Sequence, residues 1–410
     1  MGIENTYDLT LYETAEQCCA CGACVNICPS QAIYFQPDEN GFLFPQINQD
    51  KCIDCSQCLE VCIYKHPQQE VSDKETYVAV AEGIDIRQSA SGGIFASFAK
   101  NIIEKGGIVF GCAMEFEKGY FVPKHISIDN LDGLSQLQGS KYVQSSTELT
   151  YRSARDYLNA GRTVLYSGTP CQIAALKLFL GKQYDNLFTI DTICHGVPNS
   201  QFFNDSIVFE SEKRKGIITS FNFRDKSQGW KLHGKMTVEK DSKTSTVFFE
   251  PEESSYYQMF LYGYTYRESC YRCPYACDKR PGDITIGDYW CIDLVHPELL
   301  SENGGQLEQK NGVSCLIVNS GQGKKLMEEY GNEIRTWIST YEKASKYNKQ
   351  LLQPSKKPAE RDEVFTRYHQ GYAEVEEWYR ARLRPIKLRR TVVRMIPKGV
   401  KQTVKKLIKR

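Results

Sequence analysis

The cysteines nearest the N-terminus form two groups with the same spacing. Nine of the 17 cysteines lie between residues 18 and 62. The spacing C-x2-C-x2-C-x3-C occurs at Cys18, Cys21, Cys24 and Cys28, and again at Cys52, Cys55, Cys58 and Cys62. Three thiolates on such a short loop can surround one iron-sulfur cube, while the fourth, at the start of a helix, reaches a second cube. Zinc ribbons instead use C-x2-C pairs separated by a long gap. The pattern therefore predicts two 4Fe-4S clusters.

This crossed arrangement divides the eight cysteines between the two clusters. We expect the first cluster to be bound by Cys18, Cys21, Cys24 and Cys62. We expect the second cluster to be bound by Cys52, Cys55, Cys58 and Cys28. Cys19 is one residue out of register with the first group, and we expect it to be a bystander thiol.

Other cysteines are scattered over the rest of the chain. One set consists of Cys171, Cys194, Cys270, Cys273 and Cys277. Their spacing allows two interpretations, because the fold either brings some of them together around a third cluster or uses them as structural residues. Cys112, Cys291 and Cys315 lie in apolar segments or beside a tryptophan, and we expect them to be small buried residues.

The segments that must position these cysteines have a mixed pattern. The chain has 410 residues, 41% hydrophobic and 25% charged, which suits a globular protein of more than one domain. Residues 33–47 read as a β-hairpin with its turn at Asp38–Gly41. From about residue 77 to 320, short apolar runs alternate with amphipathic helices, which predicts an α/β or α+β fold. Strands are expected at 106–114, 163–168, 187–194 and 283–290, and helices at 91–106 and 170–181.

Both of these helices begin after small residues. Ser91, Gly92 and Gly93 precede the first, and the segment Ser167–Pro170 precedes the second. Small residues at a helix N-terminus allow a phosphate to reach free backbone N–H groups at the positive end of the helix dipole. The same residues are also ordinary helix caps. Two such starts in one chain strengthen the case for a dinucleotide-like cofactor.

Seven segments in a fixed order resemble one known family. They are SGGIFASFA, GSKYVQS, GTPCQIAAL, CHGVP, FRDKSQGW, SCYRCPYAC and GDITIGDYW. This order is similar to that of the beta-subunit family of coenzyme F420-reducing hydrogenases and dehydrogenases, over about residues 79–319. Members with a fused N-terminal two-cluster ferredoxin domain have the same layout as this chain. The resemblance implies that the protein binds FAD and a further 4Fe-4S cluster.

The resemblance also implies roles for individual residues. The third cluster would be bound by Cys171, Cys194, Cys270 and Cys273, with Cys277 as a possible replacement for Cys194 or Cys171. The FAD site would include Ser91, Gly92, Gly93, Lys141, Tyr142, Thr169 and Gln172. His195 follows a cluster ligand directly, so it is either a catalytic proton donor or a wall of the cluster pocket.

Pattern and resemblance together predict an α+β protein. A small ferredoxin-like two-cluster domain is expected to precede a larger flavin-binding domain, α/β-like in character, with a mixed sheet and helices. The expected parts are a two-cluster 4Fe-4S domain at 1–66, a linker at 67–76, an FAD and Fe-S domain at 77–345, and a helical extension with a basic tail at 346–410.

Three clusters and a flavin in one chain suggest a function. Clusters transfer one electron at a time, organic substrates usually accept two, and a flavin can do both. We therefore expect an FAD-dependent iron-sulfur oxidoreductase that connects a ferredoxin or other electron donor with a small-molecule or deazaflavin substrate. The alternatives are an F420-specific dehydrogenase or reductase subunit, a ferredoxin-dependent reductase in envelope polysaccharide synthesis, and a non-enzymatic electron-transfer subunit of a larger complex.

The C-terminal tail differs in charge from the rest of the chain. Residues 380–410 contain 13 Lys and Arg and no acidic residue, whereas residues 1–379 have a net charge of −12. Because apolar residues lie between the basic ones, we expect the tail to bind an anionic membrane surface. A nucleic acid is a less favoured partner, and a solvated terminus that binds nothing is the alternative. Since we find no signal peptide and no apolar run of about 20 residues, we expect a cytoplasmic protein, with peripheral attachment at the inner membrane face as a variant.

Overall fold

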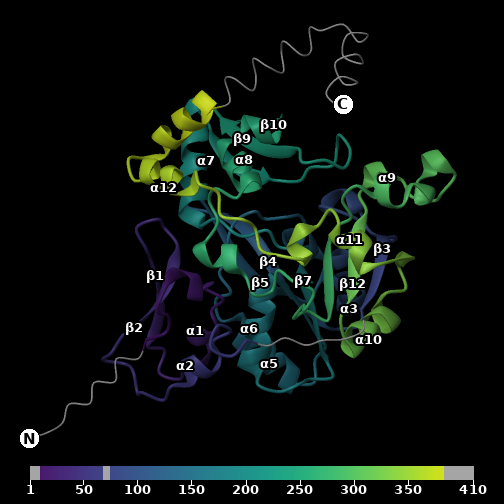
Figure 1. Ribbon diagram of the computed structural model, residues 1–410, viewed down its shortest axis with the longest axis horizontal. Helices are drawn as coiled ribbons and strands as arrows, with labels where there is room; N and C mark the ends of the chain where they lie inside the picture. Colours follow the sequence, from purple (N-terminus) through teal and green to yellow (C-terminus); the bar gives the residue numbers. More distant parts are fainter. Residues whose placement is uncertain (1–9, 68–73, 383–410) are drawn as a thin grey trace, which may run out of the picture.

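The computed structural model describes residues 10–67 and 74–382. Its N-terminal part, purple in Figure 1, contains a hairpin of the antiparallel strands β1 (Ile33–Pro37) and β2 (Leu43–Ile47). The carboxylate of Asp38 accepts hydrogen bonds from the backbone N–H groups of Asn40 and Phe42, which holds the turn between the strands. The predicted hairpin is confirmed.

Two short helices carry the cysteine motifs of this part. They are α1 (Ala23–Ile27) and α2 (Gln57–Glu60). Cys28 directly follows α1, and Cys62 lies just beyond the end of α2. The prediction that the fourth cysteine starts a helix is therefore wrong, because the helix ends before it. Three residues between the third and fourth cysteines make about one helical turn, which carries the fourth cysteine away from its own loop.

A large mixed sheet of eight strands forms the centre of the protein, in the order β13-β3-β12-β11-β7-β6-β4-β5. The four strands β11, β7, β6 and β4 are parallel, and the flanking strands are antiparallel to their neighbours. The strands are β3 (Glu75–Ala81), β4 (Ile108–Glu117), β5 (Tyr120–Ile128), β6 (Val164–Gly168), β7 (Leu187–Thr192), β11 (Ile284–Asp288), β12 (Ser314–Val318) and β13 (Ile334–Ser339). The carboxyl ends of the parallel strands share one edge, where ligands of such sheets usually bind.

Helices cover both faces of this sheet. The helices α3 (Ile94–Glu104) and α10 (Gly321–Tyr330) lie on one face, and α5 (Thr150–Asn159) and α6 (Pro170–Leu180) lie on the other. Side chains of β4 alternate between the two cores, with Val109 on the α3 side and Phe110 on the α6 side. Residues of the N-terminal part, among them Ala23, belong to the core under α5 and α6, beside which this part lies in Figure 1.

A second, antiparallel sheet contains three strands, with an aromatic core beside it. Its strands are β8 (Ile217–Asn222), β9 (Gly234–Lys240) and β10 (Lys243–Phe249). The helices of this part are α7 (Ser200–Arg214), α8 (Ser255–Tyr262) and α12 (Arg361–Tyr368), and residues 372–382 are also helical. Shorter helices elsewhere are α4 (Leu134–Leu137), α9 (Ile292–Val295) and α11 (Tyr341–Ser345). Phe202 of α7 packs against Phe365 and Tyr368 of α12, so the described part of the C-terminal extension belongs to this core.

The α+β fold class is confirmed, and all six strands and helices expected in the large domain are present with shifted ends. The boundaries proposed for the domains and the linker stay predictions. Across the described ranges, no helix is long and apolar enough to span a membrane. The basic tail from residue 383 onward lies outside the described residues, so its expected membrane contact stays a prediction.

Candidate iron-sulfur and cofactor site

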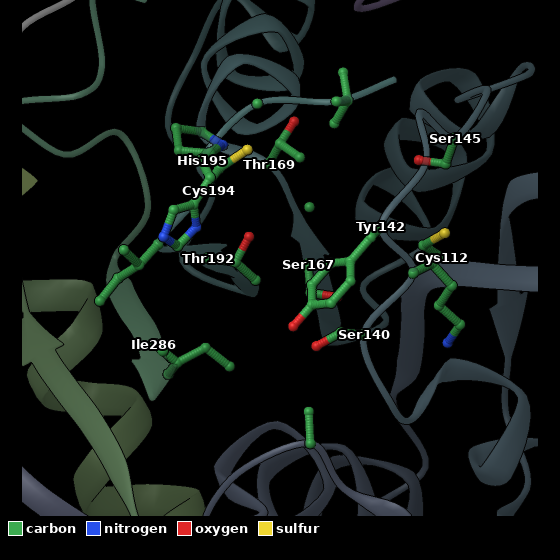
Figure 2. Close-up of a pocket in the computed structure, with 18 of the residues that line it drawn as sticks. Cys112, Ser140, Tyr142, Ser145, Ser167, Thr169, Thr192, Cys194, His195 and Ile286 are labelled. Carbon is green, nitrogen blue, oxygen red and sulfur yellow. The ribbon is translucent and has the colours of Figure 1, made fainter. Parts of the chain in front are cut away.

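A cavity of about 490 Å³ lies at the carboxyl ends of the parallel strands. Ser167 and Gly168 of β6, Thr192 of β7 and Gly287 of β11 line it. Figure 2 shows Thr192 and His195 on one side of this cavity and Tyr142 on the other. Its volume is within the range of about 300–1,000 Å³ that is usual for small-molecule and cofactor sites.

The N-terminus of α3 opens into this cavity. Gly93 precedes the helix with a φ of +83°, and a Cβ atom there would lie 2.7 Å from the side chain of Ile84. Within the described part of the chain, no side chain caps the helix start. Ser91 and Gly93 line the cavity, whereas Gly92 instead donates its N–H to the Ser314 hydroxyl at 2.9 Å. The first turn of α3 therefore has backbone donors that no side chain of its own satisfies.

The N-terminus of α6 is different. Thr169 and Gln172 form a capping box, in which the Gln172 side-chain oxygen accepts from the Thr169 N–H at 3.0 Å. The Gln172 amide nitrogen in turn donates to the Ser145 hydroxyl at 3.2 Å. Both predicted residues line the cavity, but their polar groups already have partners in the chain. Of these two helix starts, that of α3 is the one without a side-chain cap among the described residues.

Lys141 and Tyr142 also line the cavity, from the segment between α4 and α5. The Lys141 ammonium donates to the carbonyls of Gln136 and Gln138 at 2.9 and 2.8 Å, and burial lowers its pKa to about 8. The Tyr142 ring stacks on Phe260 with centroids 4.2 Å apart. Lys141 thus holds its own loop, and it would have to exchange these carbonyls for a phosphate.

Sequence reasoning did not assign roles to two basic residues that hold the start of α3. Arg224 forms a buried two-point ion pair with Asp288, with distances of 2.7 and 3.1 Å. Lys226 donates to the carbonyl of Ser91 at 2.7 Å, and burial lowers its pKa to about 8. Both residues belong to the segment FRDKSQGW. Basic residues between two aromatic residues in this segment were the only sequence feature that could have indicated their role. They fix the loop that precedes α3.

Four scattered cysteines meet at one end of the cavity, which is lined by Cys171, Cys194, Cys270 and Cys273. Cys171 lies in the first turn of α6 and Cys194 follows β7. Cys270 lies in the turn Glu268–Arg272, and Cys273 directly follows it. Burial, followed by the nearby thiols of Cys171 and Cys273, raises the pKa of Cys194 to about 12. The fold thus brings together the four cysteines that the family resemblance implies as ligands.

Two other cysteines differ from expectation. Cys277 donates to the Pro274 carbonyl at 3.3 Å and does not line the cavity, so it lies apart from the four gathered thiols. Cys19 is buried, lines the same end of the cavity, and is hydrogen-bonded to the thiols of Cys171 and Cys21. Cys19 is therefore no bystander, because it joins the N-terminal loop to the third group of cysteines.

The remaining single cysteines only partly match their predicted burial. Cys315 is fully buried, whereas Cys112 and Cys291 are half-buried and Cys112 lines the cavity. The apolar sequence around Cys112 predicted burial, but it did not indicate that this strand lines a cavity.

The N-terminal thiols form two groups. Near Cys24 lie the three other thiols of its predicted cluster, those of Cys21, Cys18 and Cys62, and also the Cys58 thiol of the second set. Near Cys58 lie three thiols of the second set, those of Cys55, Cys28 and Cys52. Within residues 10–67 and 74–382, no three such side chains converge on a point where a single metal ion could bind. In a cube each thiolate binds its own iron, so the ligands surround the cluster rather than meet at one point.

Side chains of residues 144–152 bind the loop of the first motif through its backbone. Gln144 donates to the carbonyl of Cys19 at 2.9 Å, and Tyr151 donates to that of Cys21 at 2.8 Å. Arg152 donates to the carbonyl of Cys28 at 2.7 Å. These hydrogen bonds fix the N-terminal cysteine loop on α5, beside the cavity.

Two histidines line the cavity. The side chain of His195, the predicted catalytic residue, is exposed to the open space of the cavity. The surrounding protein removes water from the imidazole, which lowers its pKa. His125 is buried, with its Nε2 atom 3.1 Å from the Ser167 carbonyl and its Nδ1 atom 3.2 Å from the Ser145 hydroxyl. Burial lowers the pKa of His125 to about 4. Sequence reasoning did not identify His125.

The low pKa of His125 predicts a pH-dependent stability. An unfolded histidine binds a proton below a pKa of about 6.5, whereas His125 in the folded protein stays neutral until about pH 4. Stability is therefore fully present above pH 6.5 and is lost as the pH falls toward 4. Between pH 7 and 5 we expect a loss of about 2 kcal/mol in the free energy of urea unfolding, which His125→Gln should largely remove. His369→Gln, at an exposed site, is the control and should leave the loss in place.

Comparison with known proteins gives two family matches. Residues 17–66 match the 4Fe-4S dicluster domain, and residues 161–344 match the C terminus of the coenzyme F420 hydrogenase/dehydrogenase beta subunit. A chain in a structure of the F420-reducing NiFe hydrogenase complex from Methanosarcina barkeri is 14% identical. That comparison covers 74% of this chain and 95% of the other, with a TM-score of 0.42. No curated protein matches the sequence significantly. The chain thus joins a 4Fe-4S dicluster domain to a C-terminal domain of the coenzyme F420 hydrogenase/dehydrogenase beta-subunit family.

Proposed function

We propose that this protein is an iron-sulfur flavoprotein oxidoreductase. It would pass electrons between a ferredoxin-type donor, its 4Fe-4S clusters and FAD, and from there to or from a two-electron substrate. The observation that carries the proposal is one cavity with two ends. Four gathered thiols line one end, and the start of α3, without a side-chain cap, lines the other.

A third 4Fe-4S cluster fits the first end of the cavity. The four proposed ligands come from three separate segments, and each is largely enclosed by protein. Among the residues that the structure describes, the buried hydroxyl of Tyr275 has no hydrogen-bond partner, although it lies close to the thiols of Cys19, Cys171, Cys21 and Cys273. A buried hydroxyl without a partner is costly, and the sulfur atoms of a cluster would supply an acceptor.

FAD fits the remainder of the cavity. The backbone N–H groups at the start of α3 would bind its pyrophosphate, with Ser91 and Gly93 leaving room for a close approach. Lys226 and Arg224 hold this loop in place through hydrogen bonds to the backbone carbonyls of Ser91 and Ala90. When bound, FAD would supply the exchange between one-electron and two-electron transfer. Exposed Thr192 and His195 at the opposite wall leave space for a substrate, which favours an enzyme over an electron-transfer subunit.

The proposal predicts one flavin per chain, which depends on Gly93. In Gly93→Ala the new Cβ atom would lie 2.7 Å from the side chain of Ile84, which is too close. The alanine would also have to adopt a φ of +83°, which strains the backbone. We expect protein purified without oxygen to contain about one FAD and G93A to lose most of it. Gly106→Ala is a matched control, because Gly106 has a φ of +80° at the other end of α3 and nothing within 4 Å. Loss of flavin from both variants, or from neither, would contradict this assignment.

The electron donor and substrate class can be tested with the same preparation. Reduction of the bound flavin by ferredoxin would identify the donor side. Reduction by reduced coenzyme F420 would favour the F420-specific form. Reduction by ferredoxin alone would favour a reductase of another organic acceptor, such as an intermediate of envelope polysaccharides. A protein that holds clusters but no flavin would be an electron-transfer subunit, and the proposed enzyme function would be wrong.

A further inference from the structure

Four arginines are buried in the described part of the chain, and Arg267 differs from the other three. Arg224, Arg280 and Arg361 each pair with a carboxylate, those of Asp288, Asp191 and Glu268. Arg267 is 0% exposed, yet within residues 10–67 and 74–382 no carboxylate forms an ion pair with it. A buried cation without an anion is strongly unfavourable. The burial of Arg267 therefore calls for a negative charge nearby that no acidic side chain of the described residues supplies.

The surroundings of Arg267 indicate where this charge lies. Its guanidinium donates to the carbonyls of Cys18 and Leu43, both at 2.7 Å, and is also hydrogen-bonded to the Cys18 thiol. Its plane lies over Phe44, 4.2 Å from the ring centroid, so the ring covers part of the guanidinium. The side chain is thus directed at the loop of the first cysteine motif.

The backbone of Arg267 belongs to the third group of cysteines. Its carbonyl accepts a hydrogen bond from the N–H of Cys270 at 2.9 Å, and its N–H donates to Val197, three residues after Cys194. One residue therefore connects the loop of the first cluster with the loops that carry the proposed ligands of the third. Gln144, 3.4 Å from the guanidinium, extends this connection to the carbonyl of Cys19.

We propose that Arg267 is a positioning residue of the first cluster, whose charge stabilises the reduced cluster and raises its reduction potential. A cube with four thiolate ligands has a net negative charge that grows on reduction, and nearby charge is one of the factors that set its potential. In a buried site the attraction is little screened by solvent. Arg152 makes a similar contact with the Cys28 carbonyl, but it is half-buried, so water weakens its effect on the second cluster.

The inference rests on the dicluster domain and the proposed ligand Cys18, and it does not depend on the flavin. It goes beyond the proposed function because it orders the clusters. A raised potential favours the first cluster as the acceptor of electrons that enter at the second cluster, where Cys55 is exposed. The first cluster is also the one that contacts the third group of cysteines through Cys19.

The test is a redox titration of the clusters followed by electron paramagnetic resonance. In Arg267→Gln we expect the equilibrium constant for reducing one cluster to fall at least tenfold, which is about 59 mV for a one-electron couple. The other clusters should keep their potentials. Arg267→Lys retains the charge and should retain most of the wild-type potential. Arg361→Gln is the matched control, because Arg361 is a buried arginine of the same aromatic region that has its own carboxylate partner.

Each outcome of this test decides the proposal. Loss of the first cluster in R267Q, with its retention at the wild-type potential in R267K, would support the role of the charge. Unchanged potentials in R267Q, an equal shift of all clusters, or the same shift in R361Q would overturn it. A shift in R267K as large as that in R267Q, or loss of the first cluster from both variants, would also overturn it. Flavin content does not enter these readings, so failure here is distinct from failure of the proposed enzyme function.

Discussion

Removing Cys270 and Cys273 together should lower the iron content of the protein from about twelve to about eight atoms per chain, because three cubes hold four irons each. Both residues are half-buried, Cys270 in the turn Glu268–Arg272 and Cys273 directly after it, and their thiols lie within one group with Cys171 and Cys194. With two of four ligands missing, the third cube loses its attachment, while the two N-terminal cubes keep all of theirs. The measurement is iron and sulfide per chain after anaerobic reconstitution of Cys270→Ala/Cys273→Ala.

Cys277→Ala provides the matched control for this experiment. Cys277 follows the same C-x2-C pair but donates to the carbonyls of Pro274 and Lys279, away from the gathered thiols. We expect this variant to retain about twelve irons. If the wild-type protein holds only about eight irons, or if C277A loses as many as the double variant, the proposed ligand set of the third cluster is wrong.

Asp191→Asn should cost about 3–5 kcal/mol of unfolding free energy, the usual effect of removing one partner of a buried ion pair. Asp191 is 0% exposed and accepts two hydrogen bonds from Arg280, one from Nε at 3.1 Å. It also accepts a hydrogen bond from the N–H of Gly282, just before β11, at 2.8 Å. The variant leaves the Arg280 charge without a partner inside the central sheet. Unfolding in urea under anaerobic conditions would measure the loss.

Two further variants show whether charge is the cause. Adding Arg280→Met to D191N removes the unpaired cation. The double variant should therefore lose less free energy of unfolding than the sum of the losses in the two single variants. Glu308→Gln removes a carboxylate from an exposed pair with Lys310 and should leave the free energy of unfolding essentially unchanged. A loss below about 1 kcal/mol in D191N would mean that water reaches the Arg280 charge.

Local spacing was enough to predict the parts of the site that are local. The hairpin between the two cysteine motifs and the segments of β4, β6, β7 and β11 are each defined by a short run of consecutive residues, and all are present with shifted ends. A cysteine motif of this kind specifies most of its own geometry, because one loop holds three of the four expected ligands of each cluster. The family matches to residues 17–66 and 161–344 agree with this reading.

The parts that sequence reasoning missed depend on contacts between distant segments. Cys19 has no signal of its own, since its contact with Cys171 exists only after the N-terminal loop packs on α6. Arg267 resembles any arginine near a cysteine pair, and only its burial without a carboxylate distinguishes it. The family resemblance implied Thr169 and Gln172 as FAD-site residues, and sequence reasoning did not show that the folded helix also uses them as its own cap.

The attachment of the first cysteine loop through its backbone carbonyls has a consequence for biosynthesis. Its partners come late in the chain: Gln144 follows Cys19 by 125 residues, and Arg267 follows Cys18 by 249. At roughly 5–20 residues per second, the ribosome makes the residues between Cys19 and Gln144 in about 6–25 s. From the completion of the second motif at Cys62 until Gln144 is made, both cysteine motifs are already synthesised but have none of these partners to dock on. Iron and sulfide can therefore be delivered to an open N-terminal module, and the rest of the protein closes over it afterwards.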